Sequence, residues 1–401
     1  MARLGKTLKS LAKHRNHWVK LMEAASPDLS VPSSLPSRLH EVTGFGSNPG
    51  SLRMLTYVPE NLPAAAPLVV VLHGCTQTAA GYDHGAGWST LADRYGFALL
   101  YPEQQRSNNP KLCFNWFQTG DIERDQGEPL SIRQMVDHMA GEHKIDRRRI
   151  HVTGLSAGGA MTAVMLATYP EVFAGGAIIA GLPYGSATSV PEAFESMFQG
   201  RAHSAREWGD LVRAASPHRG PWPTLSVWHG GADATVKAMN ADETLKQWTN
   251  VHGLSAEPSA SSTVDGHPRQ VWRDEAGREV IESFSIASMA HGTPLATGDA
   301  ENAYGAAGPF LLDVGISSTY HIAKFWGITG EVREAATVDV AAAPAPRPIA
   351  LATPQPAPRH APPRPERAPP SLKARDLGLG ALPVDIQSVI NKALKAAGLK
   401  A

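Results

Sequence analysis

The chain has 401 residues, of which 42% are hydrophobic and 18% are charged, and its 37 basic side chains balance 37 acidic ones. This length suits one large or two ordinary domains with a sizeable core. A net charge of zero provides no field that attracts nucleic acid, so we expect no nucleic-acid partner. Two cysteines are too few for a disulfide framework or a cysteine-rich zinc site, although they suffice for one bridge.

The N-terminal segment, residues 1–43, is basic and partly helical in pattern, and it lacks the continuous apolar run of a signal peptide. The longest apolar stretches of the chain, such as Ala174 to Ala180, are far shorter than the ~18 residues that a membrane span needs. We therefore expect a soluble protein without a transmembrane segment.

The C-terminal part changes composition near Ala341, where closely spaced prolines alternate with alanine and arginine. Because proline removes backbone donors and favours extended polyproline II, residues 331–383 are predicted to be a linker. Residues 384–401 regain a helical pattern, with Ile386, Val389 and Ile390 on one apolar stripe. This short helix either folds back on the domain or contacts a partner, a membrane, or a polymer or granule surface.

Between residues 44 and 330 the chain alternates short β-branched runs with helical patterns. Strands are predicted at Arg53 to Val58, Leu68 to Leu72, Phe97 to Tyr101, Arg149 to Thr153, Gly176 to Ala180, Thr224 to Trp228 and Val280 to Ile286. Helices are predicted at Trp88 to Tyr95, Ser131 to His143, Ala157 to Tyr169 and Ala238 to Val251. Continuous apolar strands suit a sheet that is covered on both faces, which predicts a doubly wound α/β domain with mainly parallel strands.

The strongest chemical signal is the sequence Gly154-Leu155-Ser156-Ala157-Gly158, between a predicted strand and a predicted helix. A serine on a tight strand-to-helix turn needs neighbours without bulky side chains. Such a turn exposes the hydroxyl and directs N–H groups of the helix start at an oxyanion beside it. Ser156 is therefore the predicted nucleophile.

A serine nucleophile needs a base, and the base needs an acid that orients it. Asp233 follows the predicted strand that ends near Trp228, at the sheet edge where open α/β folds place their sites. We predict Asp233 as the acid, with Asp210 and Asp265 as alternatives in polar stretches.

Sixteen histidines compete for the role of base. His291 follows the strand predicted at Val280 to Ile286 and begins a loop of small residues, so it is the predicted base. His229 is expected to order the Asp233 loop, and His267 lies in a turn rich in Pro, Gly and Asp.

An oxyanion hole takes one N–H from the residue after the nucleophile and one from a loop after an early strand. These donors are predicted to be Ala157 and Cys75, with Thr76 as the fallback for Cys75. His73, in the same loop, is expected to have a structural role.

These motifs together resemble the poly(3-hydroxybutyrate) depolymerase-type esterase family, to which acetylxylan and feruloyl esterases are related. The resemblance covers roughly residues 44–330 and depends on the ordered segments His73-Gly74-Cys75-Thr76-Gln77, Cys113-Phe114-Asn115-Trp116-Phe117, Gly154-Leu155-Ser156-Ala157-Gly158-Gly159-Ala160-Met161, His229-Gly230-Gly231-Ala232-Asp233 and His291-Gly292. The matching family residues are the nucleophile Ser156, the acid Asp233, the base His291 and the oxyanion donor Cys75.

The resemblance implies further features. Trp116 and Gln77 would border the substrate, and Cys75 and Cys113 would form a disulfide that clamps the oxyanion loop. It also implies an extracellular protein. Because residues 1–43 lack the apolar run of a signal peptide, the cytoplasm is the alternative location.

We therefore predict an α/β-hydrolase that cleaves esters of polyesters or their oligomers through an acyl-serine intermediate, without a metal or organic cofactor. One alternative is a carbohydrate esterase that removes acetyl or feruloyl groups from acylated sugars. A second alternative is a polymer- or granule-binding protein that uses the fold as a scaffold, which the intact Ser, Asp and His pattern argues against.

Overall fold

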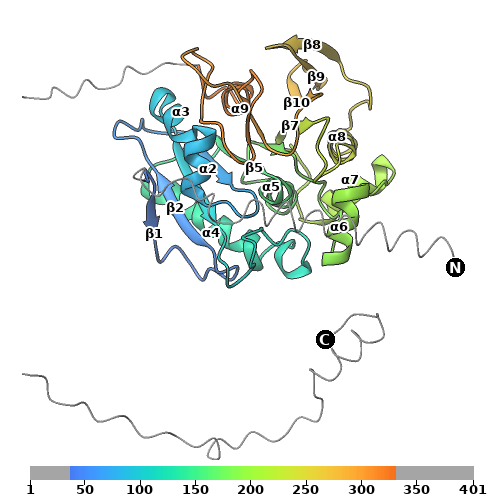
Figure 1. Ribbon diagram of the computed structural model, residues 1–401. Coiled ribbons are helices and arrows are strands. Elements are labelled where there is room, and N and C mark those ends of the chain that lie inside the picture. The colour runs from blue at the N-terminus through green and yellow to red at the C-terminus, as the bar shows by residue number, and fades with distance from the viewer. Residues whose placement is uncertain (1–36, 331–401) are drawn as a thin grey trace, which may run out of the picture. The chain divides into compact units, whose positions relative to one another are not determined.

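A computed structural model describes residues 37–330, in which a large mixed sheet forms the centre (Figure 1). The ten strands have the order β1-β2-β4-β3-β5-β6-β7-β10-β9-β8, and a separate pair is formed by β11 and β12. The strands are β1 (His40–Val42), β2 (Arg53–Tyr57), β3 (Leu68–Leu72), β4 (Ala98–Glu103), β5 (Ile150–Leu155), β6 (Gly175–Ile179), β7 (Thr224–Gly230), β8 (Ala260–Val264), β9 (His267–Arg273), β10 (Glu279–Ile286), β11 (Thr293–Leu295) and β12 (Leu311–Asp313). From β4 to β10 in this order the neighbours are parallel, and the flanking strands are antiparallel.

Helices cover both faces of the sheet. They are α2 (Ala79–Ala86), α3 (Trp88–Tyr95), α4 (Gly127–Glu142), α5 (Ala157–Thr168), α6 (Val190–Gln199), α7 (Ala205–Ala214), α8 (Met239–His252), α9 (Ser318–Phe325) and the 3-10 helix η2 (Thr119–Asp121). Because strand side chains alternate, Leu68 and Val70 join one core with α4, α5, α7 and α8, while Val69 and Val71 join a second core with α2, α3 and α9. This arrangement confirms the predicted doubly wound α/β fold.

The seven predicted strands are present with ends within two residues of the predicted ones, and three of the four predicted helices agree equally well. Helix α4 begins four residues earlier than predicted, at Gly127. The edge strands β8 and β9 are not predicted from the sequence, because their side chains are largely polar and only two of the twelve are buried. Strand β1 pairs with β2 and lies before the predicted domain start at Gly44, so the folded part begins earlier than predicted.

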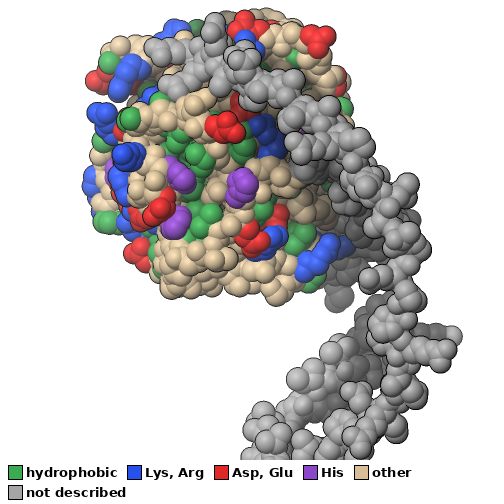
Figure 2. Space-filling view, turned by 90° about the vertical axis from the view of Figure 1, so that its left-hand side faces the viewer, with side chains coloured by type: hydrophobic (Ala, Val, Ile, Leu, Met, Phe, Trp, Pro, Cys, Tyr) green, Lys and Arg blue, Asp and Glu red, His purple; other side chains and the backbone are tan. Residues whose placement is uncertain are grey.

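The predicted linker at residues 331–383, the predicted helix at 384–401 and most of the basic N-terminal segment lie outside the described residues. Within residues 37–330, no helix is both long enough and apolar enough to cross a membrane. Figure 2 shows one face of the domain, on which basic and acidic side chains are interspersed.

The first turn of α5 approaches the end of β3 so closely that only glycine fits between them. A Cβ atom on Gly158 would lie 2.2 Å from the carbonyl oxygen of Leu72 and 2.6 Å from that of His73. Both obstacles are backbone atoms, which cannot rotate away as a flexible side chain does. This close contact fixes the start of α5 against the central sheet.

We predict that Gly158→Ala lowers the free energy of unfolding by ~1–3 kcal/mol or more, because the added methyl group forces α5 away from β3. Gly141→Ala is the matched control, since a Cβ atom at that position of α4 meets no heavy atom within 4 Å. The control should leave stability unchanged or raise it. Urea unfolding followed by circular dichroism measures both variants, and equal stabilities for the two would contradict the packing argument.

Candidate active site

Ser156 occupies the turn between β5 and α5, with φ 57° and ψ −116°. A positive φ is strained for a residue with a side chain and persists only where the surroundings hold it. Here the N–H of Ser156 donates a hydrogen bond to the carbonyl oxygen of Ile179 over 2.9 Å, which ties the turn to the neighbouring strand β6.

Ser156, His291 and Asp233 form one continuous hydrogen-bonded chain. The Oγ atom of Ser156 lies 2.8 Å from Nε2 of His291, and Nδ1 of His291 lies 2.7 Å from Oδ2 of Asp233. A carboxylate only accepts hydrogen bonds, so Nδ1 carries the proton and Nε2 is left to accept the Ser156 hydroxyl. The structure thus brings the three predicted triad residues together.

The Asp233 carboxylate is held in place by its own loop. Oδ1 accepts hydrogen bonds from the N–H groups of Thr235 and Val236, each at 2.8 Å. Burial raises the pKa of Asp233, but the hydrogen bonds from His229 and His291 outweigh it and hold that pKa below its ordinary range. The single N–H on Nε2 of His229 is shared between the carbonyl oxygen of Val236 at 2.8 Å and Oδ2 of Asp233 at 3.4 Å, so His229 orders this loop.

The loop after β3 presents the predicted oxyanion donor. Within the described part of the chain, the N–H groups of Cys75 and Ala157 donate to no acceptor, and Cys75 and Ser156 line the same pocket. The N–H of Thr76 instead donates to the carbonyl oxygen of Lys111 over 2.7 Å. Thr76, the predicted fallback, is therefore already engaged and cannot serve as the donor in this conformation.

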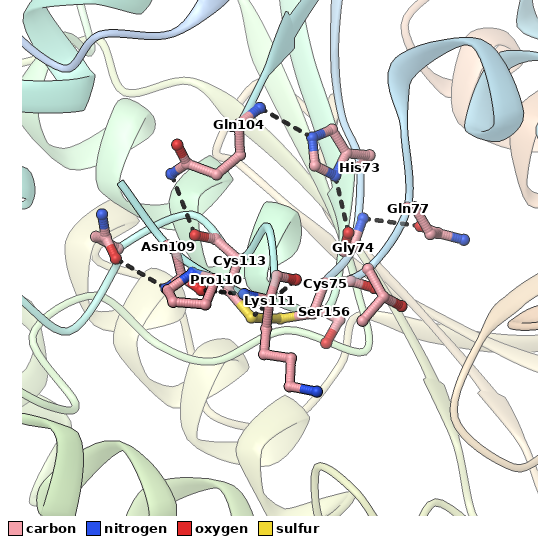
Figure 3. The surroundings of a disulfide bond; sticks show 12 residues. His73, Gly74, Cys75, Gln77, Gln104, Asn109, Pro110, Lys111, Cys113 and Ser156 are labelled. Carbon is pink, nitrogen blue, oxygen red and sulfur yellow. Dashed lines mark hydrogen bonds between the residues drawn. A yellow bond between two sulfur atoms is a disulfide. The ribbon is translucent and has the colours of Figure 1, made fainter. Parts of the chain in front are cut away.

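The predicted disulfide between Cys75 and Cys113 is present, and it links residues 38 positions apart with 4.2 Å between their Cα atoms. Figure 3 shows the bridge beside Ser156, with Lys111 and Asn109 on the segment that carries Cys113. The bridge joins the loop after β3 to the segment after β4, so it restrains the loop that presents the Cys75 N–H.

A buried polar network supports this loop from beneath. Nε2 of His73 accepts the N–H of Gln104 at 3.1 Å, and the Gln104 side-chain amide donates to Cys113 at 3.1 Å and to Glu128 at 2.6 Å. Glu128, at the start of α4, also accepts from the backbone and side-chain N–H groups of Asn115, at 3.0 and 2.9 Å. Both segments joined by the disulfide are thereby fixed to α4.

Burial controls the ionisation of this network. Burial, helped by the nearby Asp121 carboxylate, raises the pKa of Glu128 to about 8 against the opposing hydrogen bonds from Asn115 and Gln104. Burial likewise lowers the pKa of His73, which keeps this imidazole neutral. Neutral His73 donates from Nδ1 to the carbonyl oxygen of Gly74 at 2.8 Å, which is a structural role.

The alternative acids and the alternative base have partners of their own. Asp210 is exposed on α7 and pairs with Arg213 at 2.8 Å. Asp265 pairs with Nε2 of His321 at 2.8 Å, and Nε2 of His267 contacts the carbonyl oxygen of Val314 at 2.9 Å. None of these contacts involves Ser156 or His291.

A small pocket adjoins Ser156 and His291 and is lined by Gly74, Cys75, Gln77, Leu155, Ser156, Thr235, His291 and Phe310. Among residues 37–330, no three His, Cys, Asp or Glu side chains are grouped so that they could hold a metal ion. Leu155 belongs to the predicted motif around Ser156, and Thr235 lies two residues after Asp233. Phe310 follows His291 by 19 residues and belongs to no motif, so the sequence offered no signal for it.

The two predicted substrate residues differ in position. Gln77 lines the pocket, and its Oε1 atom accepts the N–H of Gly74 at 2.8 Å. Trp116 is only 6% exposed, packs edge-to-face on Phe117 within the core, and is absent from the pocket lining described above. A contact between Trp116 and substrate therefore stays a prediction.

The fold and this arrangement of Ser, His and Asp define an α/β-hydrolase of the serine esterase class. The chain belongs to the Esterase PHB depolymerase family, whose sequence model matches residues 54–269. The predicted family is thus confirmed, and the chain is a carboxylic ester hydrolase.

Named esterases are similar to this chain in sequence and in structure. The chain is 50% identical over 311 residues to poly(3-hydroxyalkanoate) depolymerase C of Paucimonas lemoignei, covering 77% of this chain and 75% of that protein. It is 34% identical over 271 residues to an acetylxylan esterase of Coprinopsis cinerea, covering 66% and 71%. The solved structure of an acetyl xylan esterase from Aspergillus awamori superposes with a TM-score of 0.62 at 26% identity, covering 72% of this chain and 99% of that one.

We predict that the stability difference between wild type and Glu128→Gln depends on pH. The folded-state pKa of about 8 lies above the ordinary carboxyl value of 4.5, so the wild type loses stability relative to the variant as pH rises through this window. The slope should approach at most ~1.4 kcal/mol per pH unit. Urea unfolding at pH 5, 6.5 and 8 measures it, with exposed Glu142→Gln as the control. A difference that is flat or reversed in sign would contradict the buried-carboxyl assignment.

We also predict that Cys113→Ser lowers the free energy of unfolding by ~2–4 kcal/mol, because the bridge closes a long loop in the unfolded chain. The same variant should lower kcat more than it raises KM. Without the disulfide, the loop after β3, which carries the proposed oxyanion donor Cys75, is no longer tied to the segment after β4. Thermal unfolding and initial-rate kinetics measure these effects. An unchanged melting temperature would show that the bridge contributes nothing to stability.

Proposed function

We propose that this protein hydrolyses esters of 3-hydroxyalkanoate polyesters or their oligomers, with Ser156 as nucleophile, His291 as general base and acid, and Asp233 as the residue that orients His291. The observation that carries this proposal is the unbroken chain from Asp233 through His291 to Ser156, with distances of 2.7 and 2.8 Å. The substrate class is supported by the relative that is 50% identical in sequence and is named as a poly(3-hydroxyalkanoate) depolymerase.

The first half of the reaction forms an acyl-enzyme. Oγ of Ser156 bonds to the ester carbonyl carbon while its proton passes to Nε2 of His291, and the carbonyl π electrons move to the oxygen. The N–H groups of Cys75 and Ala157 donate to this oxyanion. When the tetrahedral intermediate collapses, the carbon–oxygen bond to the alcohol breaks and His291 gives its proton to the leaving alcohol oxygen.

The second half regenerates the enzyme. Water loses a proton to His291 as its oxygen bonds to the acyl carbon, and collapse of the second intermediate breaks the bond to Ser156, whose oxygen recovers the proton from His291. The lowered pKa of Asp233 supports this cycle, because Asp233 stays ionised and stabilises the imidazolium formed in each half. No step needs a cofactor.

The second candidate is a carbohydrate esterase that removes acyl groups from sugars. It is favoured by the 34%-identical relative named as an acetylxylan esterase and by the superposition on an acetyl xylan esterase structure. Both candidates use the same acyl-serine chemistry and differ in the alcohol that leaves. We place the polyester first because the sequence identity to the poly(3-hydroxyalkanoate) depolymerase is higher than that to the acetylxylan esterase and extends over more of this chain.

We propose an extracellular location, because a structural disulfide persists in oxidising compartments and is rare in the cytoplasm. Native protein should then yield a linked Cys75–Cys113 peptide pair in non-reduced digests. Two free thiols in protein from its native compartment would favour the cytoplasm instead.

We predict that Ser156→Ala lowers kcat on soluble esters by ~10⁴- to 10⁶-fold and that Asp233→Asn lowers it by ~10⁴-fold, since the asparagine favours the wrong imidazole tautomer. Asp210→Asn, on exposed α7, is the matched control and should stay within twofold of wild type. Initial rates with p-nitrophenyl butyrate measure all three. Turnover of Ser156→Ala within tenfold of wild type would overturn the mechanism.

We also predict the substrate class. The ratio kcat/KM should be highest for hydroxybutyrate oligomers in a panel with acetylated xylan and feruloylated sugars. Chromatography of the released acids and sugars measures each rate. A higher kcat/KM for either sugar ester would reject the polyester and select the carbohydrate esterase.

A further inference from the structure

The proposed mechanism fixes where the alcohol part of the ester lies. To receive a proton, the leaving oxygen must come within hydrogen-bond distance of Nε2 of His291. The carbon attached to that oxygen, with its substituents, then extends past the imidazole ring. The side chain that packs on this ring beside the pocket is therefore placed to contact the alcohol group.

Phe310 is that side chain. Its ring lies edge-to-face against the His291 imidazole, with 6.0 Å between ring centroids and 77° between ring planes. Phe310 also lines the pocket that contains Ser156, and its side chain is only partly buried. An apolar surface is thus exposed beside the position of the leaving oxygen.

The backbone around Phe310 is held by the segment that directly follows His291. The carbonyl oxygen of Phe310 accepts the N–H of Thr293 at 2.8 Å, next to the parallel pairing of β11 with β12. Phe310 itself has φ 62°, a conformation that is costly for a residue with a large side chain. The ring and His291 are consequently positioned by the same short pair of strands.

We propose that Phe310 contacts the alcohol group of the scissile ester and favours alcohols whose carbinol carbon bears an apolar substituent. The partly exposed ring gains by covering an alkyl group, because apolar surface leaves water. A phenyl ring has no polar atom, so hydroxyl groups of an acylated sugar that lose water at this position find no replacement hydrogen bond there. The inference rests on the proposed function and assigns its alcohol specificity to one residue.

Two series of soluble esters separate the alcohol side from the acyl side. The first compares 2-butyl acetate with methyl acetate, and the second compares methyl butanoate with methyl acetate, all followed by pH-stat titration. In Phe310→Ala, kcat/KM for 2-butyl acetate relative to methyl acetate should fall about tenfold, which is the size expected for one or two apolar groups that lose their contact. The ratio in the acyl series should change less than twofold.

Two further variants control for disturbance of the fold. Phe310→Leu keeps an apolar side chain and should lower the alcohol ratio less than Phe310→Ala does, and it supplies the measurement if the alanine variant is unfolded. Leu312→Ala, on β12 and outside the pocket lining given above, should leave the alcohol ratio within twofold of wild type.

An alcohol ratio that is unchanged within twofold in folded Phe310 variants would overturn the inference, as would a change confined to the acyl series. Either result leaves the proposed function intact, provided that wild type hydrolyses methyl acetate and Ser156→Ala does not. Absence of Ser156-dependent hydrolysis in wild type would instead reject the proposed function and this inference together.

Discussion

The parallel pairing of β3, β5, β6, β7 and β10 is the constraint on which the site depends. Their register sets Leu72 beside Gly154, Leu155 beside Ile179, and Gly230 beside Ile286, so the strands end at one edge of the sheet. The loops after these ends carry the three residues of the hydrogen-bonded chain and the Cys75 N–H. Hydrogen bonds between residues 58 and 135 positions apart follow from this register. Loops at the carboxyl ends of parallel strands are the usual location of ligand sites in open α/β sheets.

A second set of interactions keeps the oxyanion loop in place, and it is polar and buried. The disulfide joins the two segments, and Gln104 and Glu128 fasten them to α4. Polar groups in a low-dielectric interior interact strongly when each has a partner and are costly when one is removed. The N–H of Cys75, the proposed oxyanion donor, is therefore positioned by side chains that do not line the pocket beside Ser156. Such support is what allows an oxyanion hole to stabilise charge without reorganising during the reaction.

Much of this site was predictable from the sequence, for identifiable reasons. Ser156, Asp233 and His291 each follow a strand with a strong apolar pattern, and such a pattern can be recognised from one sequence alone. Phe310 and Glu128 were not predictable, because their roles arise from contacts with residues that are distant along the chain. The engagement of Thr76 by Lys111 is likewise a tertiary contact between two loops. The edge strands β8 and β9 were not predictable because their side chains are mostly polar and few of them are buried.

The proposed mechanism requires Ser156, His291 and Asp233 to act as one unit, in which His291 makes the Ser156 oxygen nucleophilic. Covalent labelling by a fluorophosphonate reports this directly, since the reagent reacts with an activated serine and needs no substrate to turn over. Mass spectrometry of digests should find a single adduct, on the peptide that contains Ser156. The labelling rate should fall at least ~100-fold in His291→Ala, as expected when a general base is removed. An adduct on another residue, or labelling of His291→Ala at the wild-type rate, would contradict the account.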